Sequence, residues 1–305
     1  MTDAPRPEQA TPVRILTDKL TACGDKLFLR DPAGRSARPN LRPVPDADAL
    51  AASGTFLLHH DYRVSRAEGR QFVEATGDPN PIHREGNVVA GAMTLSKTLL
   101  PVEVLMPTLE ILSVHIKLTS VAFYGDRTRT VLRLARQGSG RWRGDSTTYQ
   151  SGRLVAKSTL EGRARAMLEP SAKVWEWRVN KQRLDCVKRF CDALRVAPEA
   201  YLDKGSFRDY TYPLSFVASL PSGAIVEQMS GSGGLLNSLR FEFADAAKVP
   251  IVGRTPPSVQ LEQQRKRPTF NKILANVVHG IMTYCKGHAI VHPDAGLALD
   301  GAGED

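Results

Sequence analysis

The alternation of apolar and polar positions changes character near residue 55. Residues 1–54 are rich in Pro, Ala, Asp and Arg, and only residues 13–23 carry a short amphipathic pattern, in which Leu16 and Leu20 share one face of a predicted helix. We therefore expect residues 1–54 to form a partly flexible N-terminal extension that contains one short helix.

From residue 55 onwards, the pattern predicts regular elements. Residues 55–64 have the composition of a strand, and residues 66–76 have that of a helix. Ser65 stands at the N-cap position of this helix, and Glu68, three residues later, completes a capping box. Gly77 is placed to end the helix, because glycine tolerates the left-handed conformation that commonly follows the last turn.

A second apolar helix is predicted for residues 92–105, with an interruption at Pro101. In Ser113-Val-His-Ile-Lys-Leu-Thr, apolar residues at every second position indicate a half-buried antiparallel strand. Three stretches have strand character, residues 111–124, 129–136 and 142–166. A helix followed by a run of antiparallel strands favours an α+β fold.

The same order of elements recurs after residue 172. The predicted elements are a strand, two helices and two strands, over residues 174–179, 181–194, 213–229, 236–243 and 258–264. Val64-Ser-Arg matches Val179-Asn-Lys, each leading into a helix, and Ser113-Val-His-Ile-Lys-Leu matches Ser238-Leu-Arg-Phe-Glu-Phe. These similarities favour two copies of one domain, over residues 55–170 and 171–305.

Composition and charge limit the class of protein. With 42% hydrophobic and 24% charged residues, the chain has the balance of a folded globular protein, which excludes a disordered or fibrous one. A net charge of +9 attracts acidic partners but identifies none. The N-terminal residues lack the apolar core of a secretory signal, and the longest apolar run, residues 88–106, contains Lys97 and Glu103. We expect no membrane span and a cytoplasmic location.

The pattern predicts no metal, nucleotide or nucleic-acid site. The cysteines lack the paired spacing of a zinc site, and we expect reduced thiols at Cys23, Cys186, Cys191 and Cys285. Gly231-Ser-Gly-Gly lacks the Lys-Ser/Thr of a phosphate-binding loop. The basic run at residues 264–267 has no interleaved aromatic residues on which bases could stack.

The segment Gly77-Asp-Pro-Asn-Pro-Ile-His carries the most chemical information. Its two prolines, Pro79 and Pro81, fix their own φ angles and stiffen the loop, so Asp78 and His83 are presented on a preorganised turn. A carboxylate and an imidazole near one point can bind a water molecule, take its proton and return a proton elsewhere. Addition of water across an activated double bond needs this chemistry.

This segment resembles the signature of the MaoC-like family of R-specific enoyl-CoA hydratases, also called hydratase 2, in which G-D-x-N-P-[IL]-H follows a helix. The positions that match are Gly77, Asp78, Asn80, Pro81, Ile82 and His83, and a looser match extends over residues 55–166, about a third of the chain. The resemblance implies a hot-dog fold, in which an antiparallel sheet wraps a long helix. Together with the repeated element order, it predicts a double hot-dog whose second copy is degenerate.

The resemblance also implies roles for individual residues. Asp78 and His83 correspond to the catalytic pair, and Gly91, in Val89-Ala-Gly-Ala-Met, corresponds to the N–H donor that polarises the thioester carbonyl. A helix N-terminus suits this task, because it presents unpaired N–H groups and a positive dipole end to the developing oxyanion. The predicted substrate contacts are Asn80, Ala92 and Met93.

The sequence departs from the family pattern around this site. Only seven residues separate His83 from Gly91, which is fewer than usual, Ala90 stands where a second histidine is common, and Glu85 replaces the usual Asp or Ser. The second half contains no Asp-x4-His pair. The second half is thus predicted to have no catalytic pair of its own, and its resemblance to the second half of double hot-dog hydratases implies that it completes the fold and shapes the tunnel for the acyl chain.

The predicted function is that of a hydro-lyase that interconverts a trans-2-enoyl thioester and the (3R)-3-hydroxyacyl thioester. The thioester itself acidifies C2, so no cofactor and no metal are predicted. The carrier is CoA or an acyl carrier protein, and a homodimer or a pseudo-dimeric monomer fits the repeat. A hot-dog thioesterase and a non-catalytic acyl-binding or partner protein are alternatives, and the sequence leaves the acyl-chain length and the proton donor open.

Overall fold

The computed structural model describes residues 13–15, 20–23, 26–30, 55–106, 109–164, 181–196, 212–228, 235–243, 257–266, 271–279 and 282–292. Its helices are α2 (Arg66–Thr76), α3 (Pro81–Arg84), α4 (Gly91–Leu105), α5 (Lys181–Leu194) and α7 (Leu214–Gln228), with a short 3-10 helix η1 (Gly138–Gly140). Its strands are β1 (Val13–Ile15), β2 (Leu20–Cys23), β3 (Lys26–Arg30), β4 (Thr55–Arg63), β5 (Val88–Val89), β6 (Leu109–Leu118), β7 (Ala122–Phe123), β8 (Arg127–Arg136), β9 (Arg141–Gln150), β10 (Arg153–Ala164), β11 (Leu235–Phe243), β12 (Ser258–Lys266), β13 (Asn271–His279) and β14 (Met282–His292).

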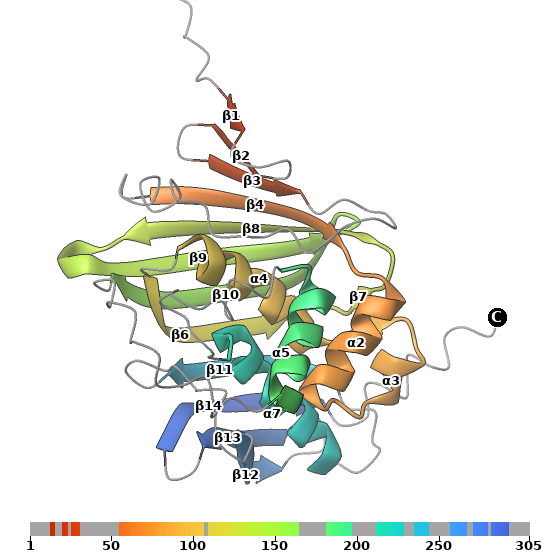
Figure 1. The fold of residues 1–305 in the computed structure, drawn as a ribbon. Helices are drawn as coiled ribbons and strands as arrows, with labels where there is room; N and C mark the ends of the chain where they lie inside the picture. Colours follow the sequence, from red (N-terminus) through yellow and green to blue (C-terminus); the bar gives the residue numbers. More distant parts are fainter. Residues whose placement is uncertain are drawn as a thin grey trace, which may run out of the picture.

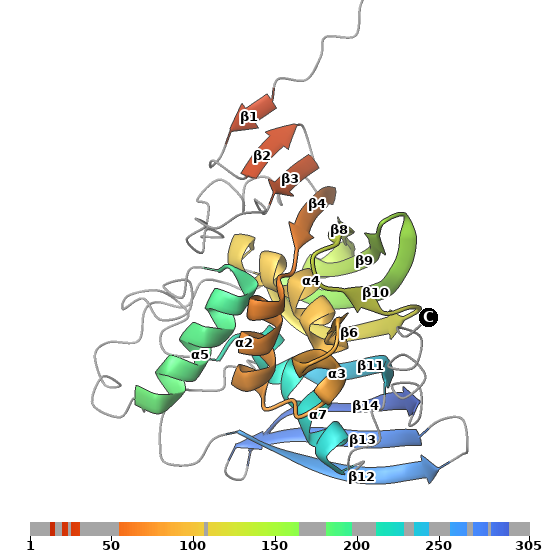
Figure 2. The same ribbon diagram turned by 90° about the vertical axis from the view of Figure 1, so that its right-hand side faces the viewer.

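One large sheet forms the body of the molecule. Twelve of the described strands follow one another in the order β1-β2-β3-β4-β8-β9-β10-β6-β11-β14-β13-β12, and all neighbours are antiparallel except β3 and β4. Strands β5 and β7 form a separate two-stranded ladder. The helices lie on one face of the large sheet (Figure 1, Figure 2), where α4 contacts α7 and β6, and α2 contacts α5.

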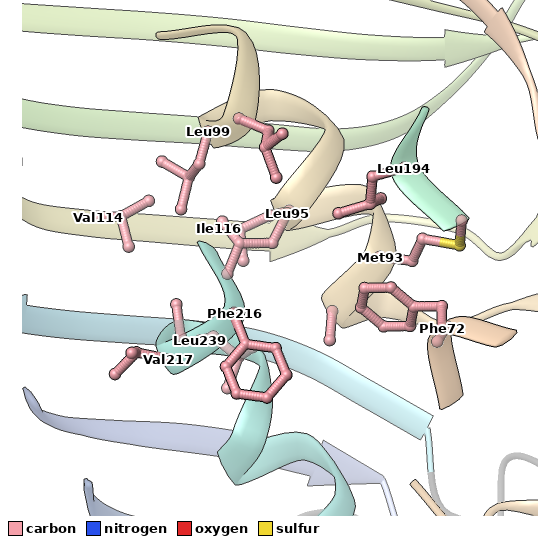
Figure 3. Close-up of a cluster of buried hydrophobic side chains, with 14 of the residues drawn as sticks. Phe72, Met93, Leu95, Leu99, Val114, Ile116, Leu194, Phe216, Val217 and Leu239 are labelled. Atoms are coloured by element: carbon pink, nitrogen blue, oxygen red, sulfur yellow. The ribbon is translucent and has the colours of Figure 1, made fainter. Parts of the chain in front are cut away.

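The hydrophobic core lies between the helices and the middle of this sheet. Helix α4 contributes Leu95 and Leu99, which are completely buried. The side chains drawn around them in Figure 3 come from both halves of the chain and include Phe72, Val114, Ile116, Phe216, Val217 and Leu239. The two halves therefore share one core rather than each forming a core of its own.

Strands β6 and β11 join the two halves. They pair antiparallel, with His115 opposite Arg240 and Val114 opposite Phe241. The sequence match of Ser113-Val-His-Ile-Lys-Leu with Ser238-Leu-Arg-Phe-Glu-Phe also aligns His115 with Arg240. A local two-fold axis through this pair would map each matched segment onto the other, so the strand register and the sequence match point to the same symmetry.

Helix α4 continues without a break through Pro101, which corrects the predicted interruption. Proline has no N–H, so the carbonyl of Lys97, four residues earlier, loses its usual helical donor. The Nδ1 of His60, on β4, lies 3.3 Å from this carbonyl oxygen and acts as the donor, since a carbonyl can only accept. A side chain of the sheet thus replaces the hydrogen bond that the proline removes.

Two charged side chains of α4 are buried where it meets the second half. Lys97 Nζ donates to the carbonyl of Leu194 at the C-terminal end of α5, at 2.9 Å. The Glu103 carboxylate accepts hydrogen bonds from the N–H groups of Leu214 and Ser215 at the start of α7, at 2.6 and 3.3 Å. Each charge meets the helix end with the opposite dipole sign, which is the favourable arrangement.

Most predicted elements are confirmed within two residues, and the helices at residues 66–76 and 181–194 have the predicted bounds. The expected helix within residues 13–23 is wrong, because residues 13–15 and 20–23 are strands β1 and β2, which with β3 extend the large sheet. An isolated helix of this length is marginal in water, and strand pairing outweighs the spacing of two leucines.

Two further differences concern hairpins. The strand predicted over residues 142–166 is two strands, β9 and β10, joined by a tight turn. Ser151 and Gly152 have φ angles of 50° and 80°, the positive values that two-residue hairpin turns require.

The sequence pattern does not predict β13 and β14, and the strand predicted at residues 174–179 lies outside the described residues.

Candidate active site

The loop after α2, residues 77–83, is shaped by the local preferences of its own residues. Gly77 ends α2 in the left-handed conformation, with φ 72° and ψ 24°. Asp78 Oδ1 accepts a hydrogen bond from the N–H of Asn80 at 3.0 Å, and Asn80 Oδ1 accepts one from Ile82 at 3.2 Å. Asn80 thereby caps α3, whose first residue is Pro81, a position where the missing N–H has no cost.

His83 lies in α3 and is 6% exposed. Its Nδ1 is 3.0 Å from the carbonyl oxygen of Val88. Because a carbonyl can only accept, Nδ1 carries the proton, and Nε2 of the neutral imidazole keeps its lone pair. Burial lowers the pKa of His83 below 6.5, and the Asp78 carboxylate and the hydrogen bond to Val88 offset this shift only in part. His83 is therefore a neutral base at neutral pH.

Asp78 is buried beside His83, with 1% of its surface exposed. Its Oδ2 is buried without a hydrogen-bond partner among the described residues. Such orphaned oxygens are rare in folded proteins, and a catalytic role is one recognised reason for them. The carboxylate raises the pKa of both His83 and Tyr124, so its charge lies within electrostatic range of both side chains.

Tyr124 and Arg84 support the loop, and no role for either is predicted from the sequence. The Tyr124 hydroxyl donates to the carbonyl of His83 at 2.9 Å, and Arg84 Nε donates to the carbonyl of Asp78 at 3.2 Å. Burial, followed by the Asp78 charge, raises the pKa of Tyr124 to about 12, so its hydroxyl keeps the proton that it donates. The sequence signal that could have indicated Tyr124 is the stretch Val121-Ala-Phe-Tyr-Gly-Asp, which lies within the looser match to the family over residues 55–166.

A cavity of about 290 Å³ opens beside this loop, and both His83 and Gly91 line it. The N-cap of α4, Ala90, makes no side-chain hydrogen bond, and the N–H groups of Gly91 and Ala92 have no acceptor in the described part of the chain. A Cβ added to Gly91 would overlap Leu118 Cδ1, so the Leu118 side chain would have to shift. The start of α4 can therefore donate hydrogen bonds to a carbonyl oxygen in the cavity.

The second half of the chain closes the cavity. Its contribution to the lining consists of Ser222 and Ile225 of α7, Leu236 and Asn237 of β11, and Val291 of β14. Helix α7 also touches the 77–83 loop, since a Cβ added to Gly223 would come within 2.6 Å of the Gly77 oxygen and 3.0 Å of the Asp78 nitrogen. The site thus lies between the two halves, although Asp78 and His83 both come from the first.

The structure divides the six predicted site residues into two groups. His83 and Gly91 line the cavity, and Asp78, Asn80, Ala92 and Met93 do not. Asn80 is fully buried as the cap of α3, and Ala92 and Met93 are core residues, among which Figure 3 shows Met93. The substrate contacts expected of Asn80, Ala92 and Met93 stay predictions.

Comparison with solved structures identifies the fold. A MaoC-like dehydratase superposes with a TM-score of 0.57 at 11% identity, over 78% of this chain and 97% of its own. A MaoC-like dehydratase from Phytophthora capsici gives 0.54 at 11% identity, over 79% and 97%. The full-length peroxisomal multifunctional enzyme type 2 from Drosophila melanogaster gives 0.52 at 13% identity, over 77% of this chain and 48% of that enzyme.

No family model matches the sequence, and no curated protein is significantly similar to it. At identities this low, the structural likeness shows the fold: this chain has the hot-dog fold of the MaoC-like dehydratases. The fold that the 77–83 segment implied is confirmed.

Other features of the described residues bear on the remaining predictions. None of their helices is both long and apolar enough to cross a membrane. Among the same residues, no group of three or more His, Cys, Asp or Glu side chains is arranged to hold a metal ion. Cys186 and Cys191 are free thiols.

Proposed function

We propose that the protein is a hydro-lyase that adds water to a trans-2-enoyl thioester, or removes it from the (3R)-3-hydroxyacyl thioester. The observation that carries this proposal is the convergence of a base and an oxyanion donor on one cavity. His83, whose Nε2 keeps its lone pair, lines this cavity, and α4 begins there with N–H groups that have no acceptor among the described residues. The fold shared with MaoC-like dehydratases supports the same class of reaction.

Each group has a defined task in the hydration direction. The N–H of Gly91 donates to the thioester oxygen and stabilises the negative charge of the forming enolate. His83 Nε2 takes a proton from the water molecule as the water oxygen bonds to C3, and the Asp78 carboxylate stabilises the resulting imidazolium. A proton returns to C2 from the Asp78–His83 pair as the carbonyl re-forms. One water molecule is consumed, and the pair ends in its starting state.

We further infer that residues 171–305 are a second hot-dog copy without a catalytic pair, and that residues 55–170 are the catalytic copy. Helices α5 and α7 followed by four antiparallel strands repeat the order of the first half, and the β6–β11 register fits a two-fold relation. The second copy supplies part of the cavity wall and the Gly223 contact. The chain then acts as a pseudo-dimer within one polypeptide, with a thioester of CoA or of an acyl carrier protein as substrate.

The Asp78→Asn variant tests the proposed reaction. It removes the charge but keeps the size of the side chain and an oxygen for the Asn80 N–H. With crotonyl-CoA or a longer enoyl-CoA, we expect the hydration rate, followed as loss of the enoyl absorbance, to fall about 10²- to 10⁴-fold. Asp145→Asn, at an exposed position on β9, is the matched control and should keep the wild-type rate.

Comparable turnover by wild type and Asp78→Asn would contradict the proposal. Release of free thiol without loss of the enoyl absorbance would instead identify a thioesterase. Tight binding of acyl thioesters by a wild-type protein that turns none of them over would identify a non-catalytic acyl-binding protein.

A further inference from the structure

The cavity contains more polar side chains than the proposed reaction uses. Besides His83, five hydroxyl or carboxamide side chains line it. Two are already paired, because the hydroxyls of Thr119 and Ser120 donate to the carbonyl of Leu154 at 2.9 and 2.8 Å. The other three make no side-chain hydrogen bond within the part of the chain that the structure describes; they are Thr94, Ser222 and Asn237.

Asn237 reaches the cavity because of a β-bulge in β11. The pairing of β11 with β14 shifts between Leu236 and Ser238, so Asn237 has no residue opposite it. Successive residues of a regular strand point to opposite faces of the sheet, yet Leu236 and Asn237 both line the cavity. Bulges re-aim side chains in this way and are frequent beside active sites.

Thr94 and Ser222 reach the cavity from the two core helices. Thr94 is 4% exposed on α4, three residues beyond Gly91 and therefore on the same helical face. Ser222 is 7% exposed on α7, next to Gly223, which packs against the 77–83 loop. Both residues are thus buried beside the groups that would carry out the reaction.

The energetics of these side chains depend on what fills the cavity. A buried polar group left without a partner costs about 1–3 kcal/mol. An unbranched alkyl chain in this space would exclude water and leave all three groups unpaired. A ligand group that can both donate and accept would pair with them, and the carboxamide of Asn237 is complementary to an amide or a hydroxyl.

We propose that Thr94, Ser222 and Asn237 form a polar subsite that binds an amide or hydroxyl group of the thioester substrate, separate from the thioester carbonyl. This inference rests on the proposed function and adds a substrate class to it: thioesters that place such a group in the cavity are preferred over purely hydrocarbon ones. Two parts of a substrate could supply this chemistry, the amides of a pantetheine arm and an oxygenated acyl chain.

The test removes the polar atoms and keeps the shape of each side chain, in Thr94→Val, Ser222→Ala and Asn237→Leu. Ser120→Ala is the matched control, because Ser120 lines the same cavity with a hydroxyl that is already bound. Dissociation constants are measured by calorimetry with saturated thioesters, which cannot be hydrated and therefore report binding whatever the reaction is. Thermal unfolding checks that each variant folds.

Two ligand pairs distinguish the sources of the polar group. Butyryl-pantetheine and S-ethyl thiobutyrate differ in the pantetheine amides, and 6-hydroxyhexanoyl-CoA and hexanoyl-CoA differ in an acyl hydroxyl. We expect the wild type to prefer the polar member of one pair, which assigns the subsite to the carrier or to the acyl chain. Each subsite variant should weaken that member about fivefold or more, the value of one hydrogen bond, and leave the apolar member within about twofold.

Equal weakening of both members of each pair would overturn the inference, as would the same loss of selectivity in Ser120→Ala. A wild type with no preference in either pair would overturn it too. Selective binding by a protein that hydrates no enoyl thioester would retain the subsite and refute the proposed function alone.

Discussion

The two long helices of the core, α4 and α7, lie side by side but begin in opposite ways. Helix α4 begins at Gly91, whose N–H has no acceptor among the described residues and which lines the cavity. Helix α7 begins at Leu214, and the N–H groups of Leu214 and Ser215 are bound by the buried carboxylate of Glu103. One helix start is open to a ligand, and the other is closed by the protein itself.

If the two halves are copies of one domain, as proposed, this difference explains why only one of them would hold a site. The positive end of a helix dipole can stabilise either a resident carboxylate or a transient oxyanion, but a helix start filled by a carboxylate would repel a second negative charge. Glu103 therefore stabilises the start of α7. Because Glu103 belongs to α4, its hydrogen bonds also hold the two halves together. The start of α4 remains available for the oxyanion of the proposed reaction.

The second half nevertheless contacts the 77–83 loop, and the Gly223→Ala variant tests whether this contact matters; of the variants that compare the two helices, we expect it to have the largest effect. The added methyl group would meet the backbone at Gly77 and Asp78, so α7 or the loop must shift. Because misplacement of catalytic groups by about 1 Å can lower rates about 10²-fold, we expect kcat for enoyl thioester hydration to fall by that order, with a smaller change in KM.

Gly138→Ala is the matched control, since a Cβ at Gly138 meets no atom within 4 Å. It should leave kcat unchanged. A Gly223→Ala variant that folds and keeps the wild-type kcat would show that the second half only encloses the cavity and does not position the Asp78 side chain.

The Glu103→Ala variant tests whether Glu103 caps the start of α7. We expect this variant to lose stability, not hydration activity. Two buried N–H groups lose their acceptor, and the start of α7 loses a compensating charge, so the free energy of unfolding should fall by about 2 kcal/mol in urea titrations. Glu242→Ala removes a mostly exposed carboxylate paired with Arg240 at 3.8 Å, and should cost less than about 0.5 kcal/mol.

Unchanged stability of Glu103→Ala would contradict the role of Glu103 as a cap. The double variant Asp78→Asn, Glu103→Ala tests the idea of one site. If it hydrates enoyl thioesters faster than Asp78→Asn does, the opened start of α7 can support the reaction by itself, which would contradict that idea.

Local signals explain why the conformation of the 77–83 loop could be predicted from the sequence. Ser65 and Glu68 form the predicted capping box, and Gly77 adopts the predicted left-handed conformation. These residues act over three or four positions of the chain, as do Asn80 and Pro81 in α3. Their spacing alone was therefore enough to place Asp78 and His83 on one short turn.

Contacts between distant segments could not be predicted in the same way. Helix α4 continues through Pro101 because His60 of β4 replaces the hydrogen bond that the proline removes. The start of α7 is capped by Glu103, which lies more than a hundred residues earlier in the chain. Similarly, the closeness of Gly223 to Gly77 and the bulge at Asn237 result from strand register and helix packing. No periodicity within a window of the sequence encodes these relations, so the cavity wall from the second half was expected only through the resemblance.

The smallest effect that we expect concerns the ionisable side chain buried near the start of α4, the neutral imidazole of His83, where the start of α7 has the carboxylate of Glu103. The pKa of buried His83 lies below 6.5, its ordinary value, so the unfolded chain binds a proton there more readily than the folded protein does. Stability from this group is therefore complete above pH 6.5 and is lost as the pH falls from 6.5 towards the folded-state pKa. Comparison of unfolding free energies at pH 7 and pH 5 should give a larger decrease in wild type than in His83→Gln. Over the same range, kcat/KM of wild type should fall only below pH 6.5, as His83 loses its Nε2 lone pair. A wild-type rate that declines already between pH 8 and pH 7 as the pH is lowered would mean that His83 is protonated at neutral pH and cannot serve as the base.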